Sequence, residues 1–189
     1  MTLRPLLALV LAAACTLAGA DERAAWAALR KDGAVALVRH GEAPGVGDPQ
    51  DWKLADCSTQ RNLDDAGRAQ ARALGARLRA ERIQVTRLIA SPWCRTLETA
   101  TLLGVGTVQP EPTFSNAFVL SERRGELSAG ARALIANWRG PGVLLVVTHG
   151  ANIAALTGRN PATAELVVVA AAADGTVREL AAVQTPPAR

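Results

Sequence analysis

The chain contains two histidines, His40 and His149, and both occur in the same sequence context. Each follows an apolar run that ends two residues earlier, at Val38 and at Val147, and each is followed directly by a glycine. Because glycine has no side chain, a ligand or another backbone segment can approach the neighbouring imidazole closely. A single histidine at the end of a strand is commonly structural, but the repeated context indicates that both histidines belong to a site.

Arginines beside these positions indicate that the site binds an anion. Arg39 places a permanent positive charge next to His40, which disfavours a metal ion and favours an anion that a planar guanidinium can bind through two hydrogen bonds. Phosphate is the obvious candidate, since a neutral imidazole can attack phosphorus and a covalent intermediate splits one difficult displacement into two. Arg95 is a second candidate, because it lies in the first turn of a predicted helix for which Ser91 is the expected N-cap.

The elements that must position these residues alternate between strands and helices. Two apolar runs, 34–38 and 143–147, predict buried strands of a parallel sheet, and 86–90 predicts a further short strand. Helices are predicted at 22–30, 64–81, 93–103, 127–138 and 151–157, and 106–119 contributes a short strand. The turn pair Asp174-Gly175 predicts a hairpin between 165–172 and 176–183. The pattern indicates an α/β fold, a three-layer α/β/α sandwich with a mostly parallel sheet and a C-terminal antiparallel hairpin.

This fold predicts where the candidate residues meet. Ligand sites in open α/β sheets lie at the carboxyl ends of the strands, and both His40 and His149 follow a predicted strand. The stretch 41–62 is rich in Gly, Pro and Asp and predicts a long surface loop beside His40. Loops of this length usually carry function.

Residues 1–20 have the features of a secretory signal peptide. Arg4 precedes an apolar run, and Ala18-Gly19-Ala20 forms a cleavage site of the A-x-A type before two acidic residues. The apolar run is shorter than the roughly 20 residues of a membrane-spanning helix, so no permanent membrane anchor is expected. Lipoprotein processing before Cys15 is the alternative. The sequence therefore predicts an exported, periplasmic protein in which 21–189 form a single domain.

Composition excludes several classes of protein. Hydrophobic residues make up 49% of the 189 residues, which is enough for a packed core and excludes a disordered chain. The formal net charge is +4, but the chain has no Tyr and only two Phe and four Trp. Few rings are thus available for stacking on bases, and we expect no nucleic-acid partner. The sequence does not indicate an oligomeric state.

Two cysteines, Cys57 and Cys94, remain after signal cleavage. An even number in an exported protein favours a disulfide, which would close a loop of about 37 residues. Two buried thiols are the alternative. Two cysteines and two histidines also equal a zinc ligand set, but no C-x-x-C or H-x-x-x-H spacing is present.

Four ordered motifs between residues 34 and 158 resemble those of the histidine phosphatase superfamily, the phosphoglycerate-mutase-like proteins. They are V-R-H-G-E at 38–42, N-L-D-D-A-G-R-A-Q-A at 62–71, S-P-W-C-R-T-L-E-T-A at 91–100 and V-T-H-G at 147–150. R-H-G alone is a weak signal, whereas four motifs in order on the expected elements are specific. The resemblance implies the phosphoglycerate-mutase-like form of the three-layer fold.

The resemblance also implies roles for the candidate residues. His40 would be the nucleophile that becomes phosphorylated, and Arg39, Arg95 and His149 would surround the phosphoryl group, with no cofactor and no metal ion. Many members have an acidic residue between the third motif and the second histidine motif. Glu122 is our choice for this general acid, with Glu111 and Glu126 as the other candidates, and a surface glutamate paired with arginine as the alternative reading of Glu122.

The resemblance implies an exported phosphomonoesterase, a histidine phosphatase. Its substrate would be a phosphorylated small molecule, an envelope sugar or a phosphoprotein, with specificity set by the segments 42–61 and 106–124. The alternative is a non-catalytic phosphate-binding envelope module of the same fold. A Cys57–Cys94 disulfide is predicted to hold the long loop against the helix that carries Arg95.

Overall fold

The computed structural model describes residues 21–185, which contain a six-stranded sheet in the order β3-β2-β4-β1-β5-β6. The strands are β1 (Ala34–Arg39), β2 (Val85–Ala90), β3 (Val108–Pro110), β4 (Val143–Thr148), β5 (Leu166–Ala171) and β6 (Val177–Val183). β1, β2, β3 and β4 are parallel to one another, whereas β5 and β6 are antiparallel to their neighbours. The predicted mostly parallel sheet with a C-terminal hairpin is confirmed. The predicted signal peptide, 1–20, lies outside the described residues.

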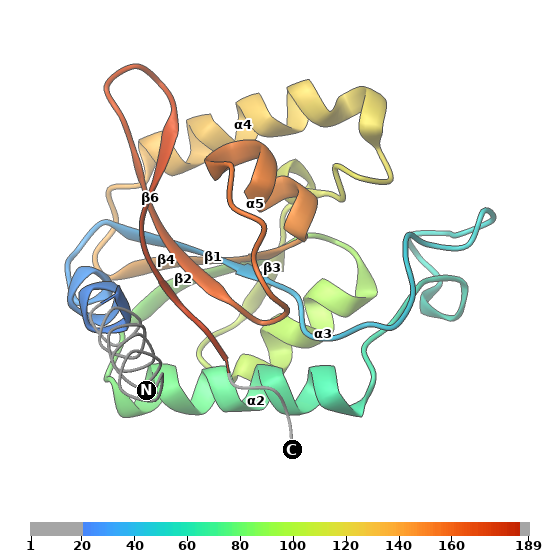
Figure 1. The fold of residues 1–189 in the computed structure, drawn as a ribbon, viewed down its shortest axis with the longest axis horizontal. Coiled ribbons are helices and arrows are strands. Elements are labelled where there is room, and N and C mark those ends of the chain that lie inside the picture. Colours follow the sequence, from blue (N-terminus) through green and yellow to red (C-terminus); the bar gives the residue numbers. More distant parts are fainter. Residues whose placement is uncertain (1–20, 186–189) are drawn as a thin grey trace, which may run out of the picture.

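Helices cover both faces of the sheet, which confirms the three-layer arrangement (Figure 1). The helix at 21–29, α2 (Asp65–Ala80) and α3 (Cys94–Leu103) cover one face. α4 (Arg124–Asn137) and α5 (Gly150–Thr157) cover the other. No helix within 21–185 is both long enough and apolar enough to span a bilayer.

β4 shows why the apolar runs form the centre of the fold. All six of its residues are buried, and successive side chains point to opposite faces of the sheet. Val143, Leu145 and Val147 join the core beneath α2 and α3, while Leu144 and Val146 join the core beneath α4 and α5. Because β4 is buried on both faces, its sequence is apolar throughout and does not alternate between apolar and polar residues.

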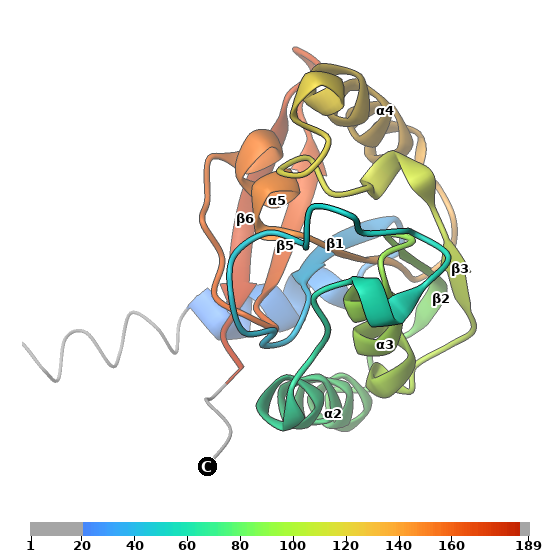
Figure 2. The ribbon, with the colours of Figure 1, turned by 90° about the vertical axis from the view of Figure 1, so that its right-hand side faces the viewer.

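The parallel strands end at the same edge of the sheet, where the long loop after β1 crosses in front of them (Figure 2). β1 and β4 are paired in register, with Arg39 opposite Thr148, so the residues that follow them emerge side by side. His40 N–H donates to Thr148 O at 3.0 Å, which continues the pairing by one residue. The fold therefore places His40 and His149 on neighbouring strand ends.

Two helix starts differ from the sequence prediction. α4 begins at Arg124 rather than 127, because a 3₁₀ turn at 121–123 leads directly into it. α3 begins at Cys94, and its N-cap is Trp93 rather than Ser91. The Ser91 hydroxyl is instead hydrogen-bonded to the His149 ring, so this side chain serves the site rather than the helix.

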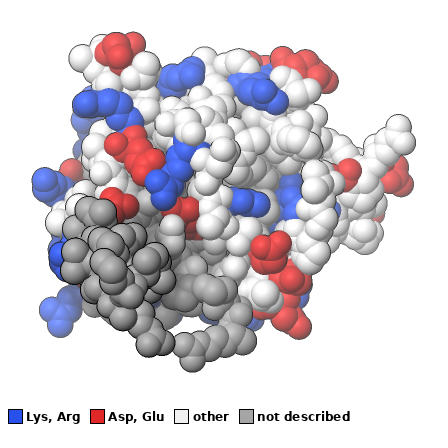
Figure 3. All heavy atoms as spheres, viewed as in Figure 1, with Lys and Arg blue, Asp and Glu red and all other residues white. Residues whose placement is uncertain are grey.

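Charged side chains lie on the surface with both signs interspersed. On the face drawn in Figure 3, Lys and Arg side chains are scattered among Asp and Glu side chains rather than gathered into one stripe. Several form surface ion pairs, such as Arg123 with Glu126 and Arg68 with Asp65. Most of the excess arginine side chains are therefore solvated at the surface.

Candidate active site

The backbone next to His40 is packed against the start of α2. A Cβ atom on Gly41 would overlap the carbonyl oxygen of Gly67, and a Cβ atom on Gly67 would overlap that of Glu42. Both positions therefore require glycine. The first and second motifs each contribute one of these glycines, and their close approach brings α2 directly against the segment that carries His40.

Two buried polar side chains hold this segment in place. Gly41 N–H donates to Thr99 Oγ1 in α3 at 3.1 Å, and Glu42 N–H donates to Gln70 Oε1 in α2 at 2.8 Å. Thr99 and Gln70 belong to the third and second motifs, and neither lines the cavity beside His40. Their function is to fix the backbone from which the His40 side chain projects.

The ring of His40 is held in a form suited to nucleophilic attack. Its Nδ1 lies 2.7 Å from Gly41 O, which can only accept, so Nδ1 carries the proton and Nε2 the lone pair. Burial lowers the pKa of His40 to about 3, the bond to Gly41 opposes this, and the charges of Arg95 and Arg39 add to the lowering. His40 is therefore neutral at physiological pH.

His149 packs edge-on against His40, with ring centroids 5.4 Å apart. Its Nε2 lies 2.8 Å from Ser91 Oγ, and both side chains are buried. The Ser91 hydroxyl hydrogen has no other partner among the described residues, so the satisfied arrangement has Ser91 donating to Nε2 and the His149 proton on Nδ1. Burial, followed by the charges of His40 and Arg95, lowers the pKa of His149 well below its usual value.

Three hydrogen-bonding groups of the predicted site residues are unpaired. Among residues 21–185, the buried side-chain polar atoms without a partner are Arg39 Nε, Arg95 Nε, His149 Nδ1 and Trp138 Nε1. Buried polar groups are nearly always hydrogen-bonded, so such atoms call for an explanation. Three of the four belong to residues predicted to surround a phosphoryl group, whose oxygens accept hydrogen bonds.

A cavity of about 390 Å³ opens beside His40. Arg39, His40 and His149 line it, so the structure brings these three predicted residues together, and Glu42 and Arg61 line it with them. Arg61 spans the adjoining loop, because its Nε donates to Gly47 O at 2.8 Å. The cavity is thus bordered by two guanidinium groups, two neutral imidazoles and one carboxylate.

Arg95 is completely buried and does not line the cavity. Its Nη1 and Nη2 donate to the two oxygens of Asp48 at 2.7 and 3.0 Å, and Nη1 also donates to Arg61 O at 3.0 Å. The first N–H of α3, that of Cys94, donates to the Gln60 side chain at 3.0 Å. The guanidinium fork and the helix start are therefore occupied by loop residues, which leaves Arg95 Nε unpaired.

Glu122 lies apart from the other predicted residues. It is exposed and does not line the cavity, and its carboxylate accepts a hydrogen bond from Ser121 Oγ at 3.1 Å. Glu111 and Glu126 also lie outside the cavity lining. Among the residues that line the cavity, Glu42 is the one with a carboxyl group, and its Oε2 accepts from Thr163 Oγ1 at 3.3 Å.

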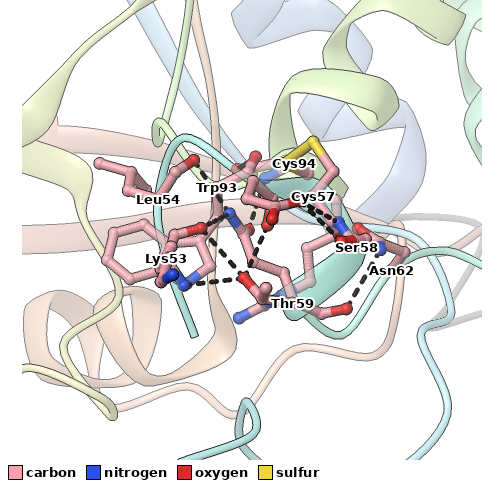
Figure 4. Close-up of a disulfide and its surroundings, with 12 residues drawn as sticks. Lys53, Leu54, Cys57, Ser58, Thr59, Asn62, Trp93 and Cys94 are labelled. Carbon is pink, nitrogen blue, oxygen red and sulfur yellow. Dashed lines mark hydrogen bonds between the residues drawn. A yellow bond between two sulfur atoms is a disulfide. The ribbon is translucent and has the colours of Figure 1, made fainter. Parts of the chain in front are cut away.

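The loop over the site is attached to α3 by a disulfide. Cys57 and Cys94 are bonded, with their Cα atoms 5.7 Å apart, which confirms the predicted pairing (Figure 4). Trp93, next to Cys94, packs on Trp52 of the loop and edge-on against His149. Because both thiols are in the disulfide, the two-cysteine, two-histidine zinc set is not formed. Within 21–185, no three His, Cys, Asp or Glu side chains are grouped to hold a metal ion.

The sequence of residues 35–118 matches the histidine phosphatase superfamily (branch 1). The fold extends the match past this range, because the structure of the protein histidine phosphatase SixA complexed with tungstate superposes on 80% of the chain and 97% of its own, with a TM-score of 0.57 and 21% identity. Over residues 35–118 the chain is thus similar to the histidine phosphatase superfamily, and over most of its length it shares the fold of a protein histidine phosphatase. No protein of curated function matches it in sequence.

Other phosphatases of known structure share the fold at low identity. A mycobacterial glucosyl-3-phosphoglycerate phosphatase complexed with inorganic phosphate is 19% identical over 82% of this chain and 97% of its own, with a TM-score of 0.56. A phosphoserine phosphatase of Entamoeba histolytica, in complex with 3-phosphoglyceric acid, is 15% identical over 80% of this chain and 97% of its own, again with a TM-score of 0.56. The family match supports a phosphatase-type function, and these neighbours show that the fold is shared.

Three residues of the site, Asp48, Arg61 and Thr99, are not among the site residues that the sequence predicts. Asp48 has no motif around it, since it lies in a loop without periodicity. Arg61 directly precedes the second motif, which begins at Asn62. Thr99 lies within the third motif, and this is the sequence feature that indicates its importance.

Proposed function

We propose that the protein is an exported phosphomonoesterase that hydrolyses a phosphate ester through a phosphohistidine on His40. The observation that carries the proposal is that two unpaired nitrogens, Arg39 Nε and His149 Nδ1, belong to residues that line one cavity with a neutral, tautomer-fixed His40. A phosphoryl group has several oxygens that accept hydrogen bonds, and it would pair with these nitrogens. The neutral imidazole would supply the nucleophile at the same place.

In the first step, the lone pair of His40 Nε2 attacks phosphorus in line with the ester oxygen. The N–P bond forms as the P–O bond to the leaving group breaks, and the leaving oxygen takes a proton. The Nδ1–H bond to Gly41 O holds the ring in position and stabilises the positive charge that the ring gains. The guanidinium groups of Arg39, Arg61 and Arg95 stabilise the phosphoryl charge.

In the second step, water attacks the phosphorus, the N–P bond breaks, and inorganic phosphate leaves with His40 restored. A carboxyl group that donates a proton in the first step can accept one from this water. The geometry does not favour Glu122 in this role, since it is exposed outside the cavity lining. We assign the role to Glu42, the carboxyl group of the cavity lining.

The proposal includes the setting of the enzyme. We propose that residues 1–20 direct export and that 21–189 form a single histidine phosphatase domain in the periplasm. The Cys57–Cys94 disulfide supports this, since disulfides persist in oxidising compartments. The substrate would be a phosphorylated small molecule or an envelope sugar.

The proposal is tested by comparing the mature protein with its His40→Ala variant. We expect the wild-type protein to hydrolyse p-nitrophenyl phosphate at least a thousandfold faster, in line with the loss of a nucleophile. After a rapid acid-free quench, mass spectrometry should find the phosphoryl group on His40. Wild-type protein that binds vanadate but hydrolyses no faster than His40→Ala would instead be the non-catalytic phosphate-binding module.

A further inference from the structure

Exposed apolar side chains stand at the mouth of the catalytic cavity. Within 21–185, the large hydrophobic residues that are exposed are Val46 (91%), Leu54 (42%), Phe118 (55%) and Leu180 (53%). Single exposed apolar residues are ordinary, but Val46 and Phe118 both line this one cavity. They come from the two segments that the sequence indicated as the source of specificity, and both segments lie on the side that faces the viewer in Figure 2.

The loop holds Val46 in its exposed position. Gly45 and Gly47, on either side, have φ values of +93° and +72°, which form a tight turn that projects the residue between them. Arg61 fixes this turn by donating to Gly47 O at 2.8 Å and to Ala43 O. The guanidinium group that borders the phosphate end of the cavity thus also supports its apolar rim.

Phe118 is held with similar precision on the opposite side. Its N–H donates to Asn116 Oδ1 at 3.0 Å, and the preceding Ala117 N–H donates to Asn152 Oδ1 at 3.1 Å. A Cβ atom on Gly47 would lie 3.6 Å from Phe118 Cε1, so the two sides of the mouth are in near contact. The hydrogen-bonded backbone around Val46 and Phe118 therefore holds both side chains in exposed positions.

Of the two substrate classes proposed above, we infer that the site takes the phosphorylated small molecule rather than the envelope sugar, and that it prefers monoesters whose leaving group is aliphatic or aromatic. The inference rests on the proposed phosphatase activity. With phosphate at His40, the leaving group must extend through the mouth and cover Val46 and Phe118, which removes apolar surface from water. The hydroxyl groups of a sugar would lose water there and would face a valine and a phenylalanine that offer no hydrogen bonds.

The test compares two esters of primary alcohols with six-membered rings, cyclohexylmethyl phosphate and glucose 6-phosphate. We expect kcat/KM to be at least tenfold higher for the cyclohexylmethyl ester. Val46→Ser and Phe118→Ser should each lower kcat/KM for this ester about three- to tenfold. The same variants should change kcat/KM for glucose 6-phosphate less, so that the ratio of the two kcat/KM values falls. Leu180→Ser is the matched control, because Leu180 is about as exposed as Phe118 but lies outside this cavity.

The outcomes separate this inference from the function on which it rests. If glucose 6-phosphate is the better substrate, or if Val46→Ser and Phe118→Ser leave the ratio of the two kcat/KM values unchanged, the apolar preference is overturned while the phosphatase stands. If neither ester nor p-nitrophenyl phosphate is hydrolysed faster than by His40→Ala, the phosphatase proposal fails, and the preference fails with it.

Discussion

Asp48 and Arg95 form an ion pair in which both side chains are completely buried. Asp48 accepts two hydrogen bonds from Arg95, one from Trp93 Nε1 at 3.1 Å and one from Arg61 N–H at 3.0 Å. Burial would raise the pKa of Asp48, but the hydrogen bonds from Arg95 and Arg61 outweigh it and hold the pKa below its ordinary value. Asp48 is therefore ionised, and it fixes the buried guanidinium group of Arg95.

Asp48→Asn should destabilise the protein strongly. The substitution keeps the shape of the side chain but leaves the charge of Arg95 buried without a counterion, which typically costs about 3 to 5 kcal/mol in the free energy of unfolding. Urea denaturation measures this loss. Asp65→Asn is the matched control, because Asp65 forms an exposed ion pair with Arg68 that contributes at most about 1 kcal/mol. Equal losses in the two variants would show that the buried pair does not stabilise the fold.

Substitution of Glu42 should affect esters according to their leaving group. An alkyl oxygen needs a proton as it leaves, whereas p-nitrophenolate does not, so Glu42→Gln should lower kcat about 100-fold for an alkyl phosphate and much less for p-nitrophenyl phosphate. Glu122→Gln is the control and should leave both rates unchanged, since Glu122 lies outside the cavity lining. The reverse pattern, with Glu122→Gln sensitive to the leaving group, would return the acid role to Glu122.

Regular elements could be predicted from the sequence because their signals are local. The run of five apolar residues at 143–147 predicted β4 within one residue, and Asp174-Gly175 predicted the turn between β5 and β6. The start of α4 was missed because 124–126 carry no apolar residue, so the helical pattern became visible only at Leu127. Such polar first turns are set by the preceding chain, here the 3₁₀ turn at 121–123.

The site could be predicted only where a residue type indicates its own chemistry. The two histidines stand after strand ends and before glycines, and Arg39 stands directly before His40, which is a local pattern. The pairing of Asp48 with Arg95 joins residues 47 positions apart in a loop and a helix, and no periodicity relates them. Ser91 is a similar case. The local pattern predicts that it caps a helix, but its hydroxyl is hydrogen-bonded to His149, 58 positions away.

Removing the disulfide should lower stability and loosen the loop that carries Asp48. In the chain-entropy account, a bridge between residues 37 positions apart contributes about 3 to 4 kcal/mol to the free energy of unfolding. A Cys57→Ser/Cys94→Ser double variant should show this loss in urea denaturation and should bind vanadate more weakly. A reductant should lower the stability of the wild-type protein and leave the double variant unchanged. If the reductant affects both proteins equally, its effect does not come from this bridge.

The two histidines should make the protein less stable as the pH falls below neutral. The pKa of His40 is about 3 in the folded protein and about 6.5 in an unfolded chain, so below pH 6.5 the unfolded state binds a proton that the folded state does not. Unfolding is therefore favoured progressively as the pH falls from 6.5 toward 3, by up to about 1.4 kcal/mol per pH unit for each such histidine. A histidine that gains an acidic partner on folding has the opposite effect, since it makes the folded protein more stable as the pH falls.

The measurement is the free energy of unfolding of wild-type protein and of His40→Gln, in phosphate-free buffer, at pH 7.5 and pH 5. His149 should still respond to pH in the variant, because its own pKa is also lowered by burial. The loss of stability between the two pH values should be about 2 kcal/mol smaller in His40→Gln than in the wild type. An identical loss in both proteins would mean that His40 is not held neutral, and the nucleophile would then need a base to remove its proton.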